Sequence, residues 1–235
     1  MINDLHNAIG HLPLLFKPHP WHGIPIGDDA PREVTCFIEI VPTDTMKYEL
    51  DKQTGYLKVD RPQQFSNVYP CLYGFIPQTY CGDRVAARSA ERTGTAGIRG
   101  DRDPMDICVL TEKGNAHGGF LLRARAVGGL RMLDGDEADD KVLAVLENDL
   151  VFGQMEDVSQ VPRGLVDRLR HYFLSYKQIP GAGPRKVQIA EVYDRAEAVE
   201  VIRRSIDDYR ERFGAPEERA RRLRQLLESA AERED

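Results

Sequence analysis

The stretch that decides the fold is Asp101-Arg102-Asp103-Pro104-Met105-Asp106, which runs directly into the apolar segment Ile107-Cys108-Val109-Leu110. Side chains alternate faces along an extended chain, so Asp101 and Asp103 are expected on the same side. Pro104 offers no N–H to a sheet and favours an extended residue before it, and Asp106 can point back to the same place. Three carboxylates this close repel one another unless a cation lies between them. The stretch therefore predicts a site for a hard divalent ion, Mg²⁺ or Mn²⁺, at the start of a strand.

The same residues could form a plain polar turn before a strand. Two better-known aspartate motifs do not fit them. An EF-hand loop would need an oxygen ligand where Met105 stands and glycine where Asp106 stands. A phosphoaspartyl Asp-x-Asp motif would follow an apolar strand, whereas Thr95-Ala96-Gly97-Ile98-Arg99-Gly100 precede Asp101. The choice between turn and metal site therefore depends on the rest of the chain.

Length and composition are those of an ordinary globular protein. A chain of 235 residues forms one large or two small domains, and 41% hydrophobic with 30% charged residues allows a full core. The net charge of −6 argues against a general nucleic-acid binder, which needs a basic face. With no membrane-length apolar run and no leader pattern, we expect no membrane partner. The cysteines have no metal-binding spacing, which indicates reduced core thiols in a cytoplasmic protein: Cys36, Cys71, Cys81 and Cys108.

The residues before the aspartates predict an irregular segment followed by antiparallel strands. Residues 1–31 mix apolar pieces with Pro and His; we interpret His19, Trp21 and His22 as packing over the core rather than binding a metal. Strands are predicted at residues 34–41, 46–50 and 56–61. Glu39 lies inside the first, apolar strand. Because an unpaired buried charge is costly, Glu39 is expected to face a cavity or a cation.

Two further pairs of polar side chains share a face. Lys47 and Glu49 lie on the same side of their strand, which is either a solvated face or part of a site. Residues 67–77 are aromatic and twice interrupted by proline, which favours a bent strand at a barrel rim. Tyr69 and Tyr73 point the same way from it; core packing is the default, although phenol hydroxyls can donate to phosphate.

Residues 82–100 break the strand pattern. They hold four arginines among small and polar residues, without apolar periodicity: Arg84, Arg88, Arg92 and Arg99. The segment therefore predicts a mobile basic surface loop, either solvated or forming a flap over an anionic ligand. Deleting residues 84–99 would then leave the fold intact.

Strands and helices follow the aspartates. Strands are predicted at residues 105–110, 120–127 and 142–146, with a second acidic run at 134–141 as a loop between the last two. A second acidic cluster in one β-rich domain favours the metal site over the turn. A helix over 162–177, a strand over 187–192, a helix over 196–213 ended by Gly214, and a charged helix from Pro216 complete the chain.

Taken in order, several segments resemble the soluble family I inorganic pyrophosphatases over about residues 34–193. The most specific match is the Asp-x-Asp-Pro-x-Asp motif followed by a strand, here Asp101–Val109. The other matching blocks are Phe37-Ile38-Glu39-Ile40, Lys47-Tyr48-Glu49, Val59-Asp60-Arg61, Tyr69-Pro70-Cys71-Leu72-Tyr73-Gly74, Asp134 to Val145, and His171-Tyr172-Phe173 with Tyr176-Lys177.

The resemblance implies Mg²⁺-dependent hydrolysis of pyrophosphate to two phosphates, with several ions per site and Mn²⁺ as a possible substitute. It implies Asp101, Asp106 and Asp139 as ligands of the first metals, with Asp106 bridging two of them, and Asp103 as base or orienter of the attacking water. It places Asp134, Glu39 and Glu49 at the remaining metals. Phosphate oxygens would be held by Lys47, Arg61, Tyr69, Lys141, Tyr176 and Lys177, with Tyr73 in support; Lys47, Arg61 and Tyr69 also count as catalytic.

The resemblance also implies a fold: mainly β with flanking helices (α+β), built on an OB-like five-stranded β-barrel. Residues 1–33 would be an N-terminal extension, 34–193 the barrel domain with the basic loop insertion at 84–99, and 194–235 C-terminal helices on the same domain. A homo-oligomer is expected.

The chain departs from the family pattern in several places. Gly135 stands where many members carry a second carboxylate, and Asp136 or Glu137 could replace it through a shifted loop. The insertion and both extensions lie outside the usual core. No clear lysine match follows Lys177, although Arg185 or Lys186 could reach the leaving phosphate.

Two functions of other classes compete with the hydrolase. The barrel could be a phosphate- or metal-binding scaffold, or a module that binds a partner through its C-terminal arm; a scaffold, however, has no need of a water-activating Asp103. A single-strand nucleic-acid binder would need a basic aromatic face, which the acidic site and net charge oppose.

Overall fold

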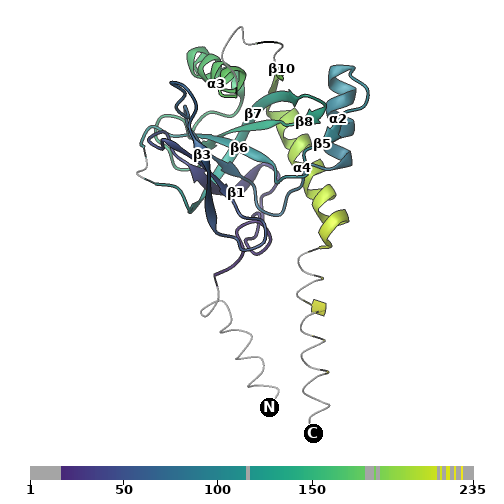
Figure 1. Cartoon of the computed structure of the whole chain (residues 1–235). Coiled ribbons are helices and arrows are strands. Elements are labelled where there is room, and N and C mark those ends of the chain that lie inside the picture. The colour runs from purple at the N-terminus through teal and green to yellow at the C-terminus, as the bar shows by residue number, and fades with distance from the viewer. Residues whose placement is uncertain are drawn as a thin grey trace.

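The computed structural model describes residues 17–114, 117–177, 183 and 186–215, together with 218, 221, 222, 225 and 229 (Figure 1). Its strands are β1 (Glu33–Ile40), β2 (Met46–Leu50), β3 (Leu57–Pro62), β4 (Leu72–Phe75), β5 (Arg99–Gly100), β6 (Asp106–Leu110), β7 (Phe120–Asp134), β8 (Glu137–Ala138), β9 (Lys141–Leu146) and β10 (Val187–Asp194). Its helices are α2 (Asp83–Thr93), α3 (Arg163–Ser175) and α4 (Arg195–Phe213), with a short 3₁₀ turn η1 (Val158–Gln160).

Five strands close into a ring. Their order is β1-β4-β6-β9-β7, and β7 pairs again with β1 through its first residues. Neighbours are antiparallel except β6 and β9, which are parallel. Strand β7 pairs with both β1 and β9, because it is long and has a bulge between Ala126 and Gly128. Beyond that bulge it also pairs with β10. The predicted OB-like five-stranded barrel is confirmed.

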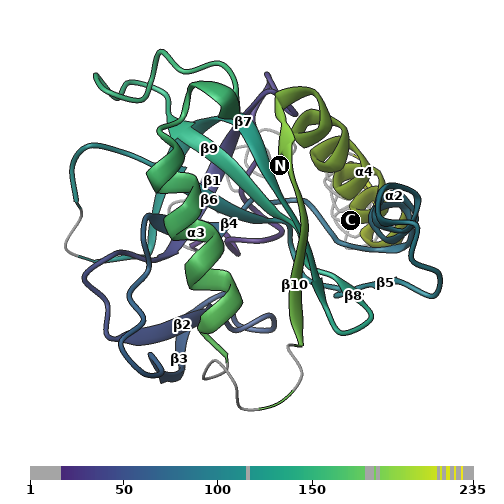
Figure 2. The same ribbon diagram turned by 90° about the horizontal axis from the view of Figure 1, so that it is seen from above.

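Helices cover two sides of the barrel (Figure 2). α3 lies on one side, where Leu169, Tyr172 and Phe173 are buried against strand residues. α4 lies on the other and buries Val201 and Ile202 in the main core. The predicted helix starts and ends agree with both elements, and Gly214 follows α4 with a φ of 76°, a backbone conformation that glycine adopts readily. The predicted helix from Pro216 lies largely outside the described residues.

The prediction of a basic loop at 84–99 is wrong, because residues 83–93 form helix α2. The buried apolar residues of α2 are Val85, which is 1% exposed, and Ala86, which is 4% exposed. α2 is anchored to α4 by Asp208, whose carboxylate accepts the backbone N–H groups of Gly82, Arg84 and Val85 at 2.9–3.2 Å. A side chain 123 to 126 residues away thus satisfies the first N–H groups of the helix, and a local sequence pattern cannot reveal that.

Replacing Val85 with alanine is expected to lower the free energy of unfolding by about 2 kcal/mol, because two buried methyl groups are lost and a small cavity remains. Arg84→Ala on the exposed face of the same helix is the control and should change stability by less than about 0.5 kcal/mol. Chemical denaturation measures both. Equal, negligible effects would mean that the segment behaves as a surface loop after all.

The described N-terminal residues pack against the barrel. Trp21 is 4% exposed and its indole N–H donates to the Thr79 carbonyl at 2.8 Å. His22 Nδ1 lies 2.8 Å from the Tyr209 hydroxyl of α4. The histidines of this segment therefore belong to an aromatic packing cluster, as interpreted from the sequence.

The division of the chain into 1–33, 34–193 and 194–235 stays a prediction. Among the described helices none has the length and apolarity needed to cross a membrane.

Candidate active site

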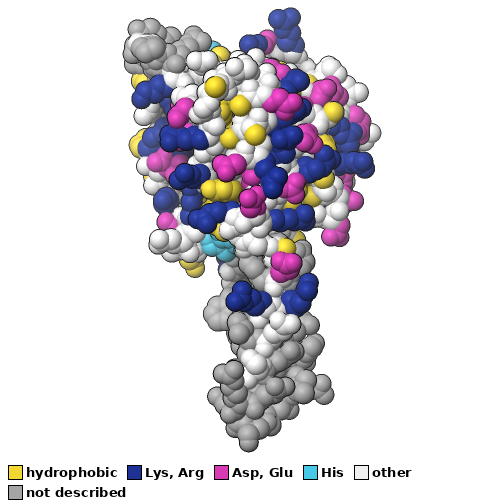
Figure 3. All heavy atoms as spheres, turned by 90° about the vertical axis from the view of Figure 1, so that its right-hand side faces the viewer, with side chains coloured by type: hydrophobic (Ala, Val, Ile, Leu, Met, Phe, Trp, Pro, Cys, Tyr) yellow, Lys and Arg dark blue, Asp and Glu magenta, His cyan; other side chains and the backbone are white. Residues whose placement is uncertain are grey.

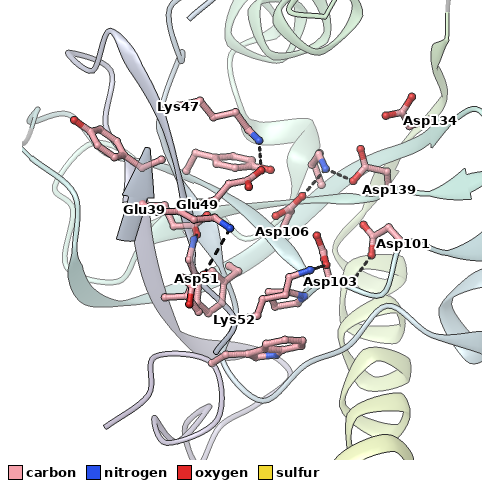
Figure 4. A pocket seen from close by; sticks show the side chains of 18 of the residues that line it. Glu39, Lys47, Glu49, Asp51, Lys52, Asp101, Asp103, Asp106, Asp134 and Asp139 are labelled. Carbon is pink, nitrogen blue, oxygen red and sulfur yellow. Dashed lines mark hydrogen bonds and ion pairs between the residues drawn. The ribbon is translucent and has the colours of Figure 1, made fainter. Parts of the chain in front are cut away.

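A cavity of about 660 Å³ lies between the β2–β3 hairpin and the segment that leads into β6. It collects side chains from distant parts of the chain (Figure 4). Glu39, Lys47 and Glu49 enter from β1 and β2, and the aspartates before and within β6 face them. Of the two candidates for the leaving phosphate, Lys186 does not line this cavity and Arg185 lies outside the described residues. All other predicted site residues except Arg61 line it: Glu39, Lys47, Glu49, Tyr69, Tyr73, Asp101, Asp103, Asp106, Asp134, Asp139, Lys141, Tyr176 and Lys177.

The residues from Asp101 to Met105 form a turn rather than the extended segment expected from the sequence. Arg102 has a φ of 67°, which is uncommon for a residue with a side chain. The turn is held by Cys81, whose N–H donates to the Asp103 carbonyl at 2.8 Å and whose carbonyl accepts from Arg102 at 3.1 Å. Asp101 Oδ1 accepts the Asp103 N–H at 2.9 Å. The backbone conformation therefore differs from the prediction, but Asp101 and Asp103 still line the cavity.

Burial raises the pKa of two carboxyl groups of the cavity, Glu39 and Asp101. Burial, reinforced by the charge of Asp106, raises the pKa of Glu39 to about 8, even though Glu39 accepts the Leu50 N–H at 2.7 Å. Burial and the charges of Asp139 and Asp106 likewise raise the pKa of Asp101 well above its usual range. A divalent cation reverses this effect because it stabilises the ionised form.

Four lysines are paired with five acidic groups of the cavity. Lys141 Nζ lies between Asp106, at 2.5 Å, and Asp139. The remaining pairs join Lys47 to Glu49, Lys52 to Asp103, and Lys177 to Asp134. Burial opposes the charge of Lys141, but the two carboxylates raise its pKa well above the ordinary value, so it stays cationic. The cavity therefore holds neighbouring positive and negative groups that are each other's partners.

Aromatic hydroxyls line the α3 side. Tyr69 and Tyr176 are 2% and 6% exposed, and their rings pack with Tyr172. Burial raises the pKa of both phenols, so they remain neutral hydrogen-bond donors. Arg61 is the exception among the predicted residues: although it pairs in register with Lys47, its Nη1 donates to the neighbouring Pro62 carbonyl at 3.3 Å instead of lining the cavity.

Several lining residues escaped the sequence reasoning. Lys52 and Asp51 belong to the β2–β3 turn, and Trp21 belongs to the N-terminal segment. Nothing in the sequence around Lys52 indicates that this turn folds over Asp103. Glu137 does fit the expected replacement for the carboxylate missing at Gly135: it lines the cavity while Arg99 lies 3.2 Å from it.

The donor set suits a hard divalent ion that keeps other ligands. Among the residues that the structure describes, no three acidic, histidine or cysteine side chains already converge as a closed metal cage. Mg²⁺ does not require one, because it is commonly bound by one or two carboxylates with water and substrate phosphate completing its coordination. Asp106 and Asp139 contact the same ammonium group, so a single cation can also reach both carboxylates.

An OB-like barrel whose cavity combines buried carboxylates with lysine and tyrosine donors defines an enzyme that acts on a small, highly charged anion. Comparisons with known proteins agree. A profile of the inorganic pyrophosphatase family matches residues 36–210. The inorganic pyrophosphatase of Chlamydia trachomatis is 52% identical over 195 residues, which cover 81% of this chain and 93% of that protein.

More distant proteins give the same result. The soluble inorganic pyrophosphatase of Oryza sativa is 37% identical over 81% of this chain and 79% of its own length. The crystal structure of inorganic pyrophosphatase from Thermus thermophilus superimposes with a TM-score of 0.68 at 30% identity, covering 81% of this chain and 99% of that one. The chain belongs to the inorganic pyrophosphatase family, a family of hydrolases.

Proposed function

We propose that the protein hydrolyses inorganic pyrophosphate to two phosphates with Mg²⁺, and that Mn²⁺ can replace it. The observation that carries the proposal is the pairing of Lys47, Lys52, Lys141 and Lys177 with acidic groups of one cavity. When divalent cations and pyrophosphate bind, they can replace these lysine–carboxylate pairs. The cations then bind the carboxylates, and the phosphate oxygens bind the lysines. Little net charge is then left buried, which keeps the cost of binding low.

The metals are assigned to the acidic side of the cavity. We propose Asp101, Asp106 and Asp139 as ligands of the first ions, with Asp106 shared, and Asp134, Glu39 and Glu49 for the remaining ions and their waters. The raised pKa values of Glu39 and Asp101 support this assignment, because buried carboxylates of that kind gain most from a nearby cation. When bound, such ions neutralise the phosphates and lower the pKa of an attacking water.

Asp103 is proposed to orient that water and accept its proton. Its side chain is 48% exposed at the cavity edge, where water reaches it, and its partner Lys52 is 52% exposed rather than buried. Water oxygen then bonds to one phosphorus, the bond from that phosphorus to the bridging oxygen breaks, and the bridging oxygen leaves with the second phosphate.

The phosphate oxygens are assigned to the cationic and phenolic side. Lys47, Lys141 and Lys177 supply positive charge, and Tyr69 and Tyr176 supply neutral donors, with Tyr73 supporting Tyr69 through a ring contact at 5.0 Å. Positive charge fixed beside the leaving phosphate stabilises the transition state more than the bound substrate. Arg61 stays in the proposal as a residue at the rim, which has to turn away from the Pro62 carbonyl to reach phosphate.

We also propose that the protein is cytoplasmic. The cysteines Cys36, Cys71, Cys81 and Cys108 are all unpaired and buried, which supports a reducing, cytoplasmic setting. The homo-oligomer stays a prediction.

A phosphate-release assay tests the function. Purified protein is expected to release phosphate from pyrophosphate in excess Mg²⁺, more slowly with Mn²⁺, and not after EDTA treatment, with activity returning when Mg²⁺ is added back. ATP and a sugar phosphate are the comparison substrates and should react far more slowly. Protein that is folded yet leaves pyrophosphate intact in excess Mg²⁺ would contradict the proposal and favour a binding scaffold.

A further inference from the structure

A network of buried ion pairs lies directly behind the cavity. Its centre is Arg131 of β7, whose side chain is 0% exposed. Arg131 Nη1 donates to Asp140 Oδ2 at 2.7 Å, and Nη2 donates to Glu197 of α4. The guanidinium also lies over the Tyr193 ring, 5.0 Å from its centroid. None of these groups lines the cavity, so they are not in contact with the substrate site itself.

The inner end of the network reaches the site through the backbone. Asp140 is fully buried, and its second oxygen, Oδ1, accepts the Met132 N–H at 3.3 Å. Its sequence neighbours on either side, Asp139 and Lys141, both line the cavity. Because Asp140 is held on one side of the chain, the direction in which Asp139 and Lys141 project on the other side is fixed.

The outer end of the network is supplied by helix α2. Arg88 holds Glu197 with two hydrogen bonds, Nε to Oε1 at 3.0 Å and Nη2 to Oε2 at 2.5 Å. Arg92 holds Glu191 in the same way, at 3.2 and 3.0 Å, and Glu191 Oε1 lies 3.5 Å from Arg131 Nε. The face of the molecule that carries α2 accordingly shows basic and acidic side chains interspersed (Figure 3).

We propose that Arg131 and Arg88 are positioning residues for the hydrolase: Arg131 fixes Asp139 and Lys141 through Asp140, and Arg88 fixes Arg131 through Glu197. The α2 segment is thereby part of the support of the active site and not only a surface addition. This inference rests on the proposed function, because it takes Asp139 as a metal ligand and Lys141 as a phosphate-binding residue. Side chains that orient metal ligands typically change metal affinity or activity by about 10- to 100-fold when they are removed.

The test compares two arginines of the same helix. Arg88→Met cuts the network, whereas Arg84→Met is the matched control, since Arg84 also pairs with an α4 carboxylate, Glu211 at 2.9 Å, but one with no contact to Arg131. Binding of Mn²⁺ to the full chain is measured by calorimetry without substrate, and thermal unfolding is followed in parallel. We expect Mn²⁺ affinity to fall by roughly 10-fold in Arg88→Met and to stay at the parent value in Arg84→Met, with similar unfolding midpoints for both.

Two further variants test the two ends of the network. Arg88→Lys keeps the charge and is expected to restore part of the lost affinity; Asp140→Asn cuts the inner end and should weaken Mn²⁺ binding at least as much as Arg88→Met. Equal Mn²⁺ affinity in Arg88→Met and Arg84→Met would overturn the proposal. The proposal would also be overturned if the loss of Mn²⁺ affinity in Arg88→Met were explained entirely by the fraction of unfolded protein. Failure of the proposed function is distinguishable, because it shows as absent phosphate release in the parent protein whatever the variants bind.

Discussion

Replacing Asp103 with asparagine is expected to lower the turnover of magnesium pyrophosphate by about 10²- to 10⁴-fold, the usual contribution of a positioned proton acceptor. Asparagine has the same shape but cannot take a proton from water. The Asp103 carboxylate pairs with Lys52 and its side chain is 48% exposed, while the bonds that hold the turn come from the Asp103 backbone. The fold should therefore be unaffected, and the loss should appear in kcat with a much smaller change in KM.

The control for this variant is Asp136→Asn. Asp136 lies in the second acidic run, is 64% exposed and pairs with Arg99 instead of lining the cavity. Its replacement should leave turnover within about twofold of the parent, since removing an exposed ion pair changes little. Steady-state phosphate release measures both variants, and circular dichroism checks the fold. Full activity in Asp103→Asn would remove the proposed role of Asp103.

Replacing Arg131 with methionine is expected to lower the free energy of unfolding by about 3–5 kcal/mol, which is the usual cost of removing one partner from a buried ion pair. Asp140 would be left as a buried carboxylate without its guanidinium partner, and Glu197 would keep only its pair with Arg88. Because a domain of this kind is stable by only about 5–15 kcal/mol, such a variant would be close to unfolding. The role of Arg131 in the site is for that reason better tested through Arg88, whose side chain is 19% exposed.

Arg123→Met provides a matched control on the same strand. Arg123 also faces three carboxylates, with its guanidinium 3.0–3.4 Å from Asp29, Glu33 and Glu147, but its side chain is 43% exposed. Water and salt screen these exposed pairs, so the loss should stay near or below about 1 kcal/mol. Chemical denaturation of both variants decides the point; equal losses would show that burial of Arg131 is not what makes its ion pairs important.

The barrel was predicted through the family resemblance, whereas the positions of its strands follow from local patterns. Alternating strand residues and the ordered blocks around Asp101–Val109 gave the strand positions, and the topology joins them in the expected ring. The set of carboxylates was assigned through the resemblance, and strand patterns added support for some of its members. Glu39 is an example: a charge inside an apolar strand indicates a cavity, and that is where its side chain lies.

What sequence reasoning missed depends on long-range contacts. Helix α2 gains its first hydrogen bonds from Asp208. Strand β7 continues past Val127 by pairing with β9 and β10, and Gly129 leaves room there for the Tyr193 ring, which a Cβ would approach to 2.4 Å. The turn at Arg102 depends on Cys81. Lys52 reaches Asp103 only because the β2–β3 hairpin folds across the cavity. Each of these features joins segments whose separation in the sequence hides the contact.

The central claim is that Asp101, Asp106 and Asp139 share divalent cations. The most direct test is anomalous diffraction from crystals of the protein grown with Mn²⁺ and phosphate. We predict anomalous peaks within coordination distance of these three carboxylates, with Asp106 contacting two ions and Lys141 turned towards phosphate. Crystals saturated with Mn²⁺ that show no peak at these carboxylates, with Lys141 still between Asp106 and Asp139, would contradict the account.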